Sequence, residues 1–121
     1  MKILVVEDNP DVGPLFTRML AINGLEARLA TTVVDALAIA GDWQPDLVLL
    51  DLGMPREEDG YQLAVDLRIV AGLRDAKIVA LSGFAPDERR KAECGIDGHL
   101  MKPVKLAVVL QLAKGQVVAA Q

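Results

Sequence analysis

Five polar side chains in this chain each stand at the end of a short apolar run. They are the carboxylates of Glu7, Asp8 and Asp51, the hydroxyl of Ser82 and the ammonium of Lys102. If the runs are parallel strands of one sheet, their carboxyl ends meet at one edge and these groups surround a crevice. Two carboxylates about 4 Å apart repel by roughly 4 kcal/mol at an effective dielectric constant of about 20. Three of them are therefore expected to bind a cation.

The chemistry of these groups favours Mg²⁺ and a phosphoryl group. All of the candidate ligand atoms are oxygens, and none belongs to a histidine or cysteine, which favours Mg²⁺ over zinc. A carboxylate beside the ion can act as a nucleophile and form an acyl phosphate, while Lys102 and Ser82 hold other phosphoryl oxygens. The residues thus predict a site that receives a phosphoryl group.

The elements that must position these groups alternate along the chain. Apolar runs that begin 20–31 residues apart predict five strands, at residues 2–6, 26–30, 46–50, 77–81 and 99–101. Segments with helical periodicity lie between them, at residues 11–22, 36–40, 61–70 and 87–93, and a last helix begins after Pro103. Thr32 and Asp35 have the spacing of a capping box, and Gly41 is expected to end the helix that follows. This spacing is typical of βα units and predicts an α/β fold with a parallel sheet and helices on both faces.

Composition excludes several classes of protein. The chain has 121 residues, of which 52% are apolar and 25% charged, so it forms one folded domain, residues 1–121. No apolar run is long enough to span a membrane, and no signal peptide precedes Glu7, so we expect a cytoplasmic protein. A net charge of −4 argues against direct binding of nucleic acid. A single cysteine, Cys94, allows neither an internal disulfide nor a CxxC motif.

Five segments in order resemble the receiver domains of two-component response regulators. They are Ile3-Leu4-Val5-Val6-Glu7-Asp8, Val48-Leu49-Leu50-Asp51-Leu52-Gly53-Met54-Pro55, Asp59-Gly60-Tyr61, Val79-Ala80-Leu81-Ser82-Gly83 and Gly98-His99-Leu100-Met101-Lys102-Pro103. The resemblance implies a doubly wound, flavodoxin-like sheet of five parallel strands in the order 2-1-3-4-5.

The resemblance also implies a role for each site residue. Asp51 matches the phosphoacceptor of the family and contributes to the metal site. Asp8 matches the direct Mg²⁺ ligand, and Glu7 the acid that holds a metal-bound water. The backbone carbonyl of Gly53 falls where the family supplies a further protein oxygen to the metal.

Three further positions match the family's switch. Ser82 matches the hydroxyl that turns toward the phosphoryl group, and Lys102 matches the lysine that pairs with it. His99 stands three residues before the lysine, where the family often has an aromatic switch residue. A histidine there either couples the switch to pH or faces solvent.

The partners implied by the resemblance are proteins. The phosphodonor is a phosphohistidine on a sensor histidine kinase or a phosphotransfer protein. The face around the fourth helix, fifth strand and fifth helix then binds a downstream target. Such a domain is a switch that assists its own phosphorylation and dephosphorylation, not a turnover enzyme.

Two features depart from the family pattern near the phosphoacceptor. Arg56, Glu57 and Glu58 make the following loop one residue longer than usual and add negative charge. Phe84 stands where the family controls access of hydrolytic water, whereas Gly53 offers no side chain to block it.

The last helix is unusually apolar. Eight of the ten residues 104–113 are apolar, and a helix on one face of a sheet needs only about half of its surface apolar. One interpretation is a homodimer or docking face, and the other is that the small Ala107 and Ala113 simply lie outward.

Two other functions remain open from the sequence. A degenerate receiver would act only as an interaction module, without modification of Asp51. A phosphatase of the haloacid dehalogenase type also uses a strand-end aspartate with Mg²⁺. However, it needs a second acid where Gly53 stands, and this chain has no room for a cap domain.

Overall fold

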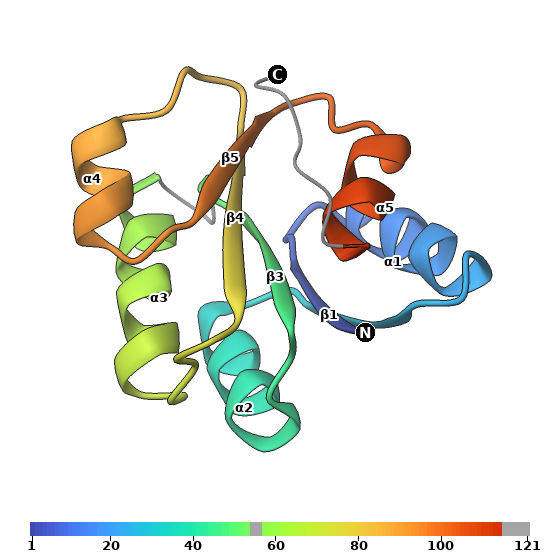
Figure 1. Cartoon of the computed structure of the whole chain (residues 1–121), viewed down its shortest axis with the longest axis horizontal. Helices are drawn as coiled ribbons and strands as arrows, with labels where there is room; N and C mark the ends of the chain where they lie inside the picture. Colours follow the sequence, from blue (N-terminus) through green and yellow to red (C-terminus); the bar gives the residue numbers. More distant parts are fainter. Residues whose placement is uncertain (54–56, 115–121) are drawn as a thin grey trace.

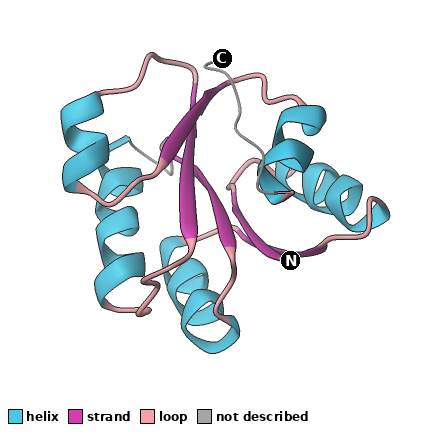
Figure 2. Ribbon diagram, viewed as in Figure 1, coloured by secondary structure: helices cyan, strands magenta, loops and turns pink. Residues whose placement is uncertain are grey.

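The computed structural model describes residues 1–53 and 57–114, except for the side chains of Glu57 and Glu58. Within these ranges strands and helices alternate strictly (Figures 1 and 2). The strands are β1 (Lys2–Val6), β2 (Glu26–Ala30), β3 (Leu47–Asp51), β4 (Lys77–Ser82) and β5 (Gly98–Met101). The helices are α1 (Val12–Ile22), α2 (Val33–Trp43), α3 (Glu57–Ile69), α4 (Glu88–Glu93) and α5 (Leu106–Ala113).

The strands form one parallel sheet in the order β2-β1-β3-β4-β5. Helices α1 and α5 cover one face of the sheet, and α2, α3 and α4 cover the other (Figure 1). The predicted α/β fold and strand order are therefore confirmed. Among the described residues, none of the helices has both the length and the apolar character needed to cross a bilayer.

The sheet is buried on both faces because its central strands are apolar throughout. In β1, Leu4 and Val6 pack toward the face covered by α2 and α3, whereas Ile3 and Val5 pack toward α1 and α5. All five residues of β3 are buried, including Asp51 at its end. Continuous burial of this kind is typical of parallel sheets, and it fixes where each strand end emerges.

The second helix corrects one prediction from the sequence. It runs through Gly41 to Trp43 instead of ending at Gly41. The end is made by Gln44, which adopts a left-handed conformation with φ of 52°. Its side-chain amide donates to the carbonyls of Ala40, Gly41 and Ala71. The predicted capping contact is present, since the Thr32 hydroxyl accepts a hydrogen bond from the Asp35 N–H at 3.1 Å. The helix begins directly after Thr32, at Val33, three residues before the predicted segment 36–40.

The third helix begins at Glu57, four residues earlier than the predicted start at Tyr61. It therefore includes Gly60, which packs directly on the chain that leaves β3. A Cβ atom at Gly60 would lie 2.5 Å from both the Cα and the carbonyl oxygen of Leu52. Only glycine allows this close approach of α3 to the end of β3.

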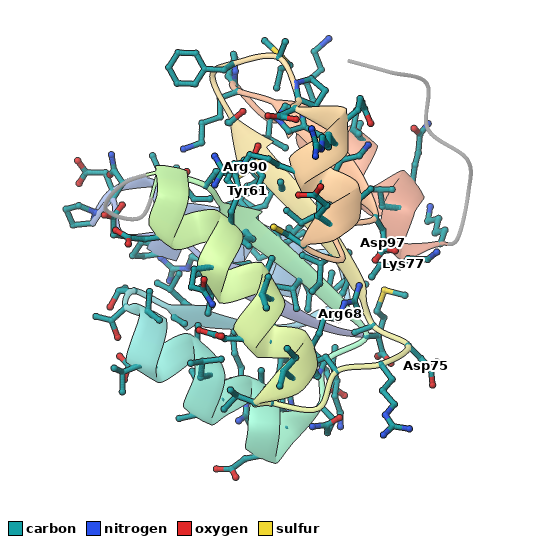
Figure 3. The ribbon with its side chains drawn as sticks, turned by 90° about the vertical axis from the view of Figure 1, so that its left-hand side faces the viewer. Tyr61, Arg68, Asp75, Lys77, Arg90 and Asp97 are labelled. Atoms are coloured by element: carbon teal, nitrogen blue, oxygen red, sulfur yellow. The ribbon has the colours of Figure 1, made fainter. Side chains whose placement is uncertain are left out.

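Polar contacts of one arginine tie together the loops at the amino end of β4. The Arg68 guanidinium donates to the carbonyls of Gly95, Leu73 and Ala76 and pairs with Asp97 at 2.8 Å (Figure 3). Near the opposite end of α3, Arg90 of α4 lies 4.0 Å from the ring centroid of Tyr61 (Figure 3). Helix α4 has no buried residue, so these contacts are important for its placement.

The single tryptophan of the chain lies at the end of α2. The Arg28 guanidinium is 4.6 Å from the ring centroid of Trp43, and the Lys2 ammonium is 5.9 Å from it. Lys2 also donates to the carbonyl of Trp43 at 3.2 Å. The indole ring thus lies within cation–π range of two cations, one from β1 and one from β2.

Candidate functional site

Three carboxylates meet at the carboxyl edge of the sheet. Glu7 and Asp8 follow β1, and Asp51 is the last residue of β3. Ligand oxygens of the three lie within 4.8 Å of one another. Glu7 and Asp51 are buried, whereas Asp8 is exposed. The predicted acidic cluster therefore exists, and its oxygens are close enough to share one metal ion.

Lys102 brings the positive charge to this cluster. Its ammonium lies 3.1 Å from Asp51 Oδ1 and 3.5 Å from Glu7 Oε1. The residue follows β5, and its backbone N–H donates to the carbonyl of Ser82 at 2.8 Å, which continues the β4–β5 pairing. Strand pairing thus places the lysine directly over the two buried carboxylates.

The two buried carboxylates, Glu7 and Asp51, differ in their protonation. Burial, together with the hydrogen bond and negative charge of Asp51, raises the pKa of Glu7 to about 7. Burial also opposes ionisation of Asp51. However, hydrogen bonds with Glu7, the Gly53 N–H and Lys102 outweigh it and lower the pKa of Asp51. Below about pH 7 in the absence of metal, Glu7 therefore carries the proton and Asp51 the charge.

Lys102 remains charged in this setting. Burial lowers the pKa of its ammonium, but the hydrogen bond and charge of Asp51, with Glu7, more than compensate and raise the pKa above its usual value. One oxygen of Asp51, Oδ1, is fixed by two donors, the Lys102 ammonium and the Gly53 N–H at 3.0 Å. The arrangement presents an oriented, ionised carboxylate beside a cation, as a nucleophile toward a phosphoryl group requires.

The model of the response regulator receiver domain family matches residues 3–114 of the chain. The chain belongs to this family. It is therefore a response regulator receiver domain, a type of domain that serves phosphorylation-controlled signalling.

Two relatives and one solved structure show the range of this similarity. The sensor histidine kinase RcsC of Escherichia coli K12 is 35% identical over 111 residues, which are 92% of this chain but 12% of RcsC. The polar-differentiation response regulator DivK of Brucella ovis is 28% identical over 115 residues, 93% of each chain. The chemotaxis protein CheY4 of Vibrio cholerae superposes with a TM-score of 0.85 over 96% of this chain and 98% of its own. At 23% identity, CheY4 supports the fold alone.

Ser82 lies at the receiver site, but its hydroxyl is engaged elsewhere. Asp51, Ser82 and Lys102 line one cavity of about 260 Å³. The hydrogen bonds of the Ser82 hydroxyl among the described residues go to Phe84 and to His99 Nε2, the latter at 2.7 Å. The sequence predicted that Ser82 stands at the carboxyl end of its strand, and Ser82 is the last residue of β4. The sequence did not predict the contact between Ser82 and His99.

Asn9 also shapes the receiver site and was missed from the sequence. Its side-chain oxygen accepts hydrogen bonds from the N–H groups of Asp11 and Val12, at 2.9 and 3.1 Å. This caps the start of α1 and fixes the loop that carries Glu7 and Asp8. Asparagine shortly before a helix is a capping signal, and Asn9 stands three residues before Val12, so this role could have been read from the sequence.

A larger hollow opens beside the acidic cluster on the α1 side. It has a volume of about 650 Å³ and is lined by Glu7, Asp8, Asp51 and Lys102 together with apolar residues that include Phe16. The cluster is therefore open to a partner or substrate. The expectation for the longer loop stays a prediction, because Arg56 and the side chains of Glu57 and Glu58 lie outside the described residues.

Proposed function

We propose that Asp51 is the phosphoacceptor of this receiver domain. The observation that carries this proposal is the 3.1 Å contact between the Lys102 ammonium and Asp51 Oδ1 within a cluster of three carboxylates. Asp51 is buried and its lowered pKa keeps it ionised. The donor is a phosphohistidine on a sensor histidine kinase or a phosphotransfer protein.

Phosphoryl transfer requires that the protein orient the nucleophile and neutralise charge on the phosphoryl oxygens. An Asp51 oxygen forms a bond to phosphorus while the phosphorus–nitrogen bond of the donor breaks, and the bonding electrons stay with the imidazole nitrogen. Lys102 compensates the charge that gathers on the phosphoryl oxygens. Because Oδ1 is held by Gly53 and Lys102, the carboxylate needs little reorganisation before it reacts.

We also propose that the cluster holds Mg²⁺. The donors would be Asp8, Asp51 and the backbone carbonyl of Gly53, with Glu7 holding a metal-bound water. In the described part of the chain, the group of residues that could hold a metal ion consists of three carboxylates. Mg²⁺ prefers oxygen ligands of this kind. When bound, the ion supplies electrostatic stabilisation of the transferring oxygens. Glu7 favours binding of Mg²⁺ only when its carboxyl is ionised. Because the pKa of Glu7 is raised to about 7, we expect the affinity for Mg²⁺ to increase with pH near neutrality.

The partners and location complete the proposal. The face formed by α4, β5 and α5 binds a downstream protein target, and the domain assists its own phosphorylation and dephosphorylation without turnover of a substrate. The net charge of −4 is unfavourable for direct contact with nucleic acid. A cytoplasmic location remains the prediction from the sequence.

Phosphorylation by a small donor tests the proposal directly. The protein is incubated with Mg²⁺ and acetyl phosphate, and its intact mass is measured with and without a chelator. We expect one phosphoryl group on the wild type, and none on Asp51→Asn or after chelation. Asp42→Asn, which changes an exposed aspartate of α2, is the matched control and should be modified as the wild type is.

The same experiment separates the alternatives. An unmodified wild-type protein would indicate a degenerate interaction module. With phosphate monoesters in place of acetyl phosphate, continuous release of phosphate would indicate a phosphatase. A modified Asp51→Asn variant would assign the phosphoryl group to another residue.

A further inference from the structure

The loop between β1 and α1 carries two of the three carboxylates of the acidic cluster. Glu7 and Asp8 follow β1 directly, and α1 begins at Val12. The Glu7 end of the loop is fixed, because the Glu7 N–H donates to the Ala30 carbonyl at 3.0 Å and the Glu7 side chain is buried. The Asp8 side chain is exposed, and within the described ranges it has no hydrogen-bond or ion-pair partner. The position of the Asp8 carboxylate therefore depends on the backbone on either side of it.

Asn9 fixes the backbone on the other side of Asp8. Its side-chain oxygen accepts from the N–H groups of Asp11 and Val12, at 2.9 and 3.1 Å. Its carbonyl accepts from the Gly13 N–H at 3.1 Å. Backbone N–H groups can only donate, so the side-chain atom that faces them must be the amide oxygen. Three consecutive N–H groups at the start of α1 thus converge on one residue.

Close packing links the start of α1 to the acidic cluster. A Cβ atom at Gly13 would lie 3.4 Å from the carbonyl oxygen of Glu7, so the first turn of α1 lies directly against the backbone that carries the cluster. Burial and the neighbouring Asp51 raise the pKa of Glu7, whereas Lys102 and the Asn9 backbone oppose this and favour the ionised carboxylate. Asn9 therefore acts on Glu7 through its backbone and holds α1 through its side chain.

We propose that Asn9 is a positioning residue of the Mg²⁺ site, and that its side chain holds Asp8 where the ion can bind it. This inference rests on the proposed role of the acidic cluster. The Asn9 oxygen already accepts from two backbone N–H groups, so Asn9 acts through the loop and does not bind the ion itself. Without this side chain the loop must become ordered when the ion binds, which lowers the affinity for Mg²⁺.

A titration with Mg²⁺, followed by thermal unfolding, tests this proposal without any phosphorylation. For each protein the rise in unfolding temperature is measured relative to its own metal-free state, at about pH 8, where Glu7 is mostly ionised. Asn9→Ala should need about tenfold more Mg²⁺ than the wild type for the same rise. Asn9→Ser keeps a side-chain oxygen at the helix start and should respond to Mg²⁺ within about twofold of the wild type.

Asn23→Ala is the matched control, because it removes an asparagine from the other end of the same helix. The exposed Asn23 side chain donates to the Met19 carbonyl at 2.8 Å. Asn23→Ala should lower the unfolding temperature of the metal-free protein but leave the response to Mg²⁺ unchanged. An equal loss of the Mg²⁺ response in Asn9→Ala and Asn23→Ala would reflect helix stability alone and would overturn the proposal.

A second variant keeps the test open if Asn9→Ala does not fold. Glycine at a helix start costs little stability but offers no side-chain acceptor. Asn9→Gly should therefore fold and should show the same weaker response to Mg²⁺ as expected for Asn9→Ala. A response equal to that of the wild type would contradict the proposal.

Kinetics of phosphorylation give an independent readout. With acetyl phosphate, Asn9→Ala should react more slowly than the wild type at low Mg²⁺, and the two rates should agree within about twofold when Mg²⁺ is saturating. A slower rate that persists at saturating Mg²⁺ would mean that Asn9 affects the reaction and not the binding of the ion, contrary to the proposal.

The two proposals fail in different ways. If Mg²⁺ raises the unfolding temperature of neither the wild type nor any variant, the proposed metal site is wrong. If the wild type and Asn9→Ala respond equally to Mg²⁺, the metal site stands and only the role of Asn9 is wrong.

Discussion

Glu7 and Asp51 show how burial assigns different roles to two neighbouring carboxylates. Both are buried, yet Lys102 and the Gly53 N–H stabilise the charge of Asp51, and Glu7 keeps its proton up to about pH 7. The free energy of unfolding must therefore depend on the ionisation of Glu7. In the unfolded chain Glu7 ionises near its ordinary pKa of 4.5, and in the folded protein near 7. The contribution of the protonated Glu7 carboxyl to the free energy of unfolding is complete below pH 4.5 and is lost as the pH rises through 7.

Glu7→Gln should stabilise the metal-free protein at alkaline pH. Glutamine keeps the shape and a hydrogen-bond donor but carries no charge, so we expect a gain on the order of 2 kcal/mol at about pH 8. The gain should shrink at about pH 6, where Glu7 is protonated in the wild type. Thermal unfolding at both values, with a chelator present, measures the difference.

Mg²⁺ should reduce the stability advantage of Glu7→Gln over the wild type. Added Mg²⁺ is expected to raise the unfolding temperature of the wild type more than that of Glu7→Gln, because the variant has lost one acid of the site. Glu26→Gln removes an exposed acid of β2 and serves as the control. A gain that is equal at both pH values would contradict the assignment of the proton to Glu7.

The polar residues of the site were predictable because each one terminates an apolar strand. Glu7, Asp51 and Ser82 needed only the rule that parallel strands end at a common edge. The bond between Ser82 and His99 was not predictable in this way. It depends on which residues of β4 and β5 lie diagonally, and that register appears only once the strands pair.

At the scale of elements, α3 is positioned by contact between backbones. Gly60 lies against the backbone of Leu52, immediately after the strand that ends in Asp51. The glycine of the Asp59-Gly60-Tyr61 segment thus has a packing role that is independent of any chemistry at the site. That position 60 must be glycine could not be derived from the sequence, because the predicted helix began at Tyr61, one residue after Gly60.

Gly60→Ala should destabilise the protein by about 3 kcal/mol, since the new methyl group would force α3 away from Leu52. Gly41→Ala is the matched control. Gly41 lies inside α2 with no neighbouring atom within 4 Å of a Cβ, so alanine there should stabilise by about 0.5–1 kcal/mol. Denaturant unfolding curves of both variants give the comparison, and equal effects at the two positions would contradict the close approach.

Arg68→Met should cost about 2–3 kcal/mol of stability. The substitution leaves the carbonyls of Gly95, Leu73 and Ala76 without their donor and breaks the pair with Asp97. Hydrogen exchange should accelerate most in the loops that precede β4 and β5.

Arg89→Met is the control for Arg68, because its pair with Glu93 is exposed and should contribute less than about 0.5 kcal/mol. A similar loss in both variants would show that the Arg68 contacts have no special weight. The contacts of Arg68 with the loops could not be foreseen from the sequence, because an arginine with five donors fits many carbonyl arrangements.

At the scale of the whole molecule, the two faces of the sheet explain most of the apolar composition. In α5, Val108 and Val109 are buried against the sheet, whereas Ala107 and Gln111 are exposed. For Ala107, this exposure agrees with the interpretation that small residues of this apolar helix simply lie outward. Ala113 instead packs partly against the core. The alternation of strands and helices was predicted correctly because continuous apolar runs and helical periodicity are both visible without long-range information.

A homodimer through α5 remains a prediction with a clear measurement. Light scattering of the protein with Mg²⁺ and beryllofluoride should give a mass that rises with concentration. Ala107→Glu, on the exposed side of α5, should abolish the rise, whereas Val34→Glu on α2 should not. A monomer mass under all conditions would end this proposal and leave the face to other partners.

The position of Trp43 makes the molecule its own fluorescence probe. The indole lies close to Arg28 and Lys2 and precedes the amino end of β3, while the acidic cluster lies at the carboxyl end of the same strand. Loss of the fold separates the ring from both cations and changes its emission, whereas a ligand at the other end of the sheet leaves the ring in place. Unfolding curves recorded with and without Mg²⁺ can therefore be compared directly, since the optical signal follows the fold and not the occupancy of the site.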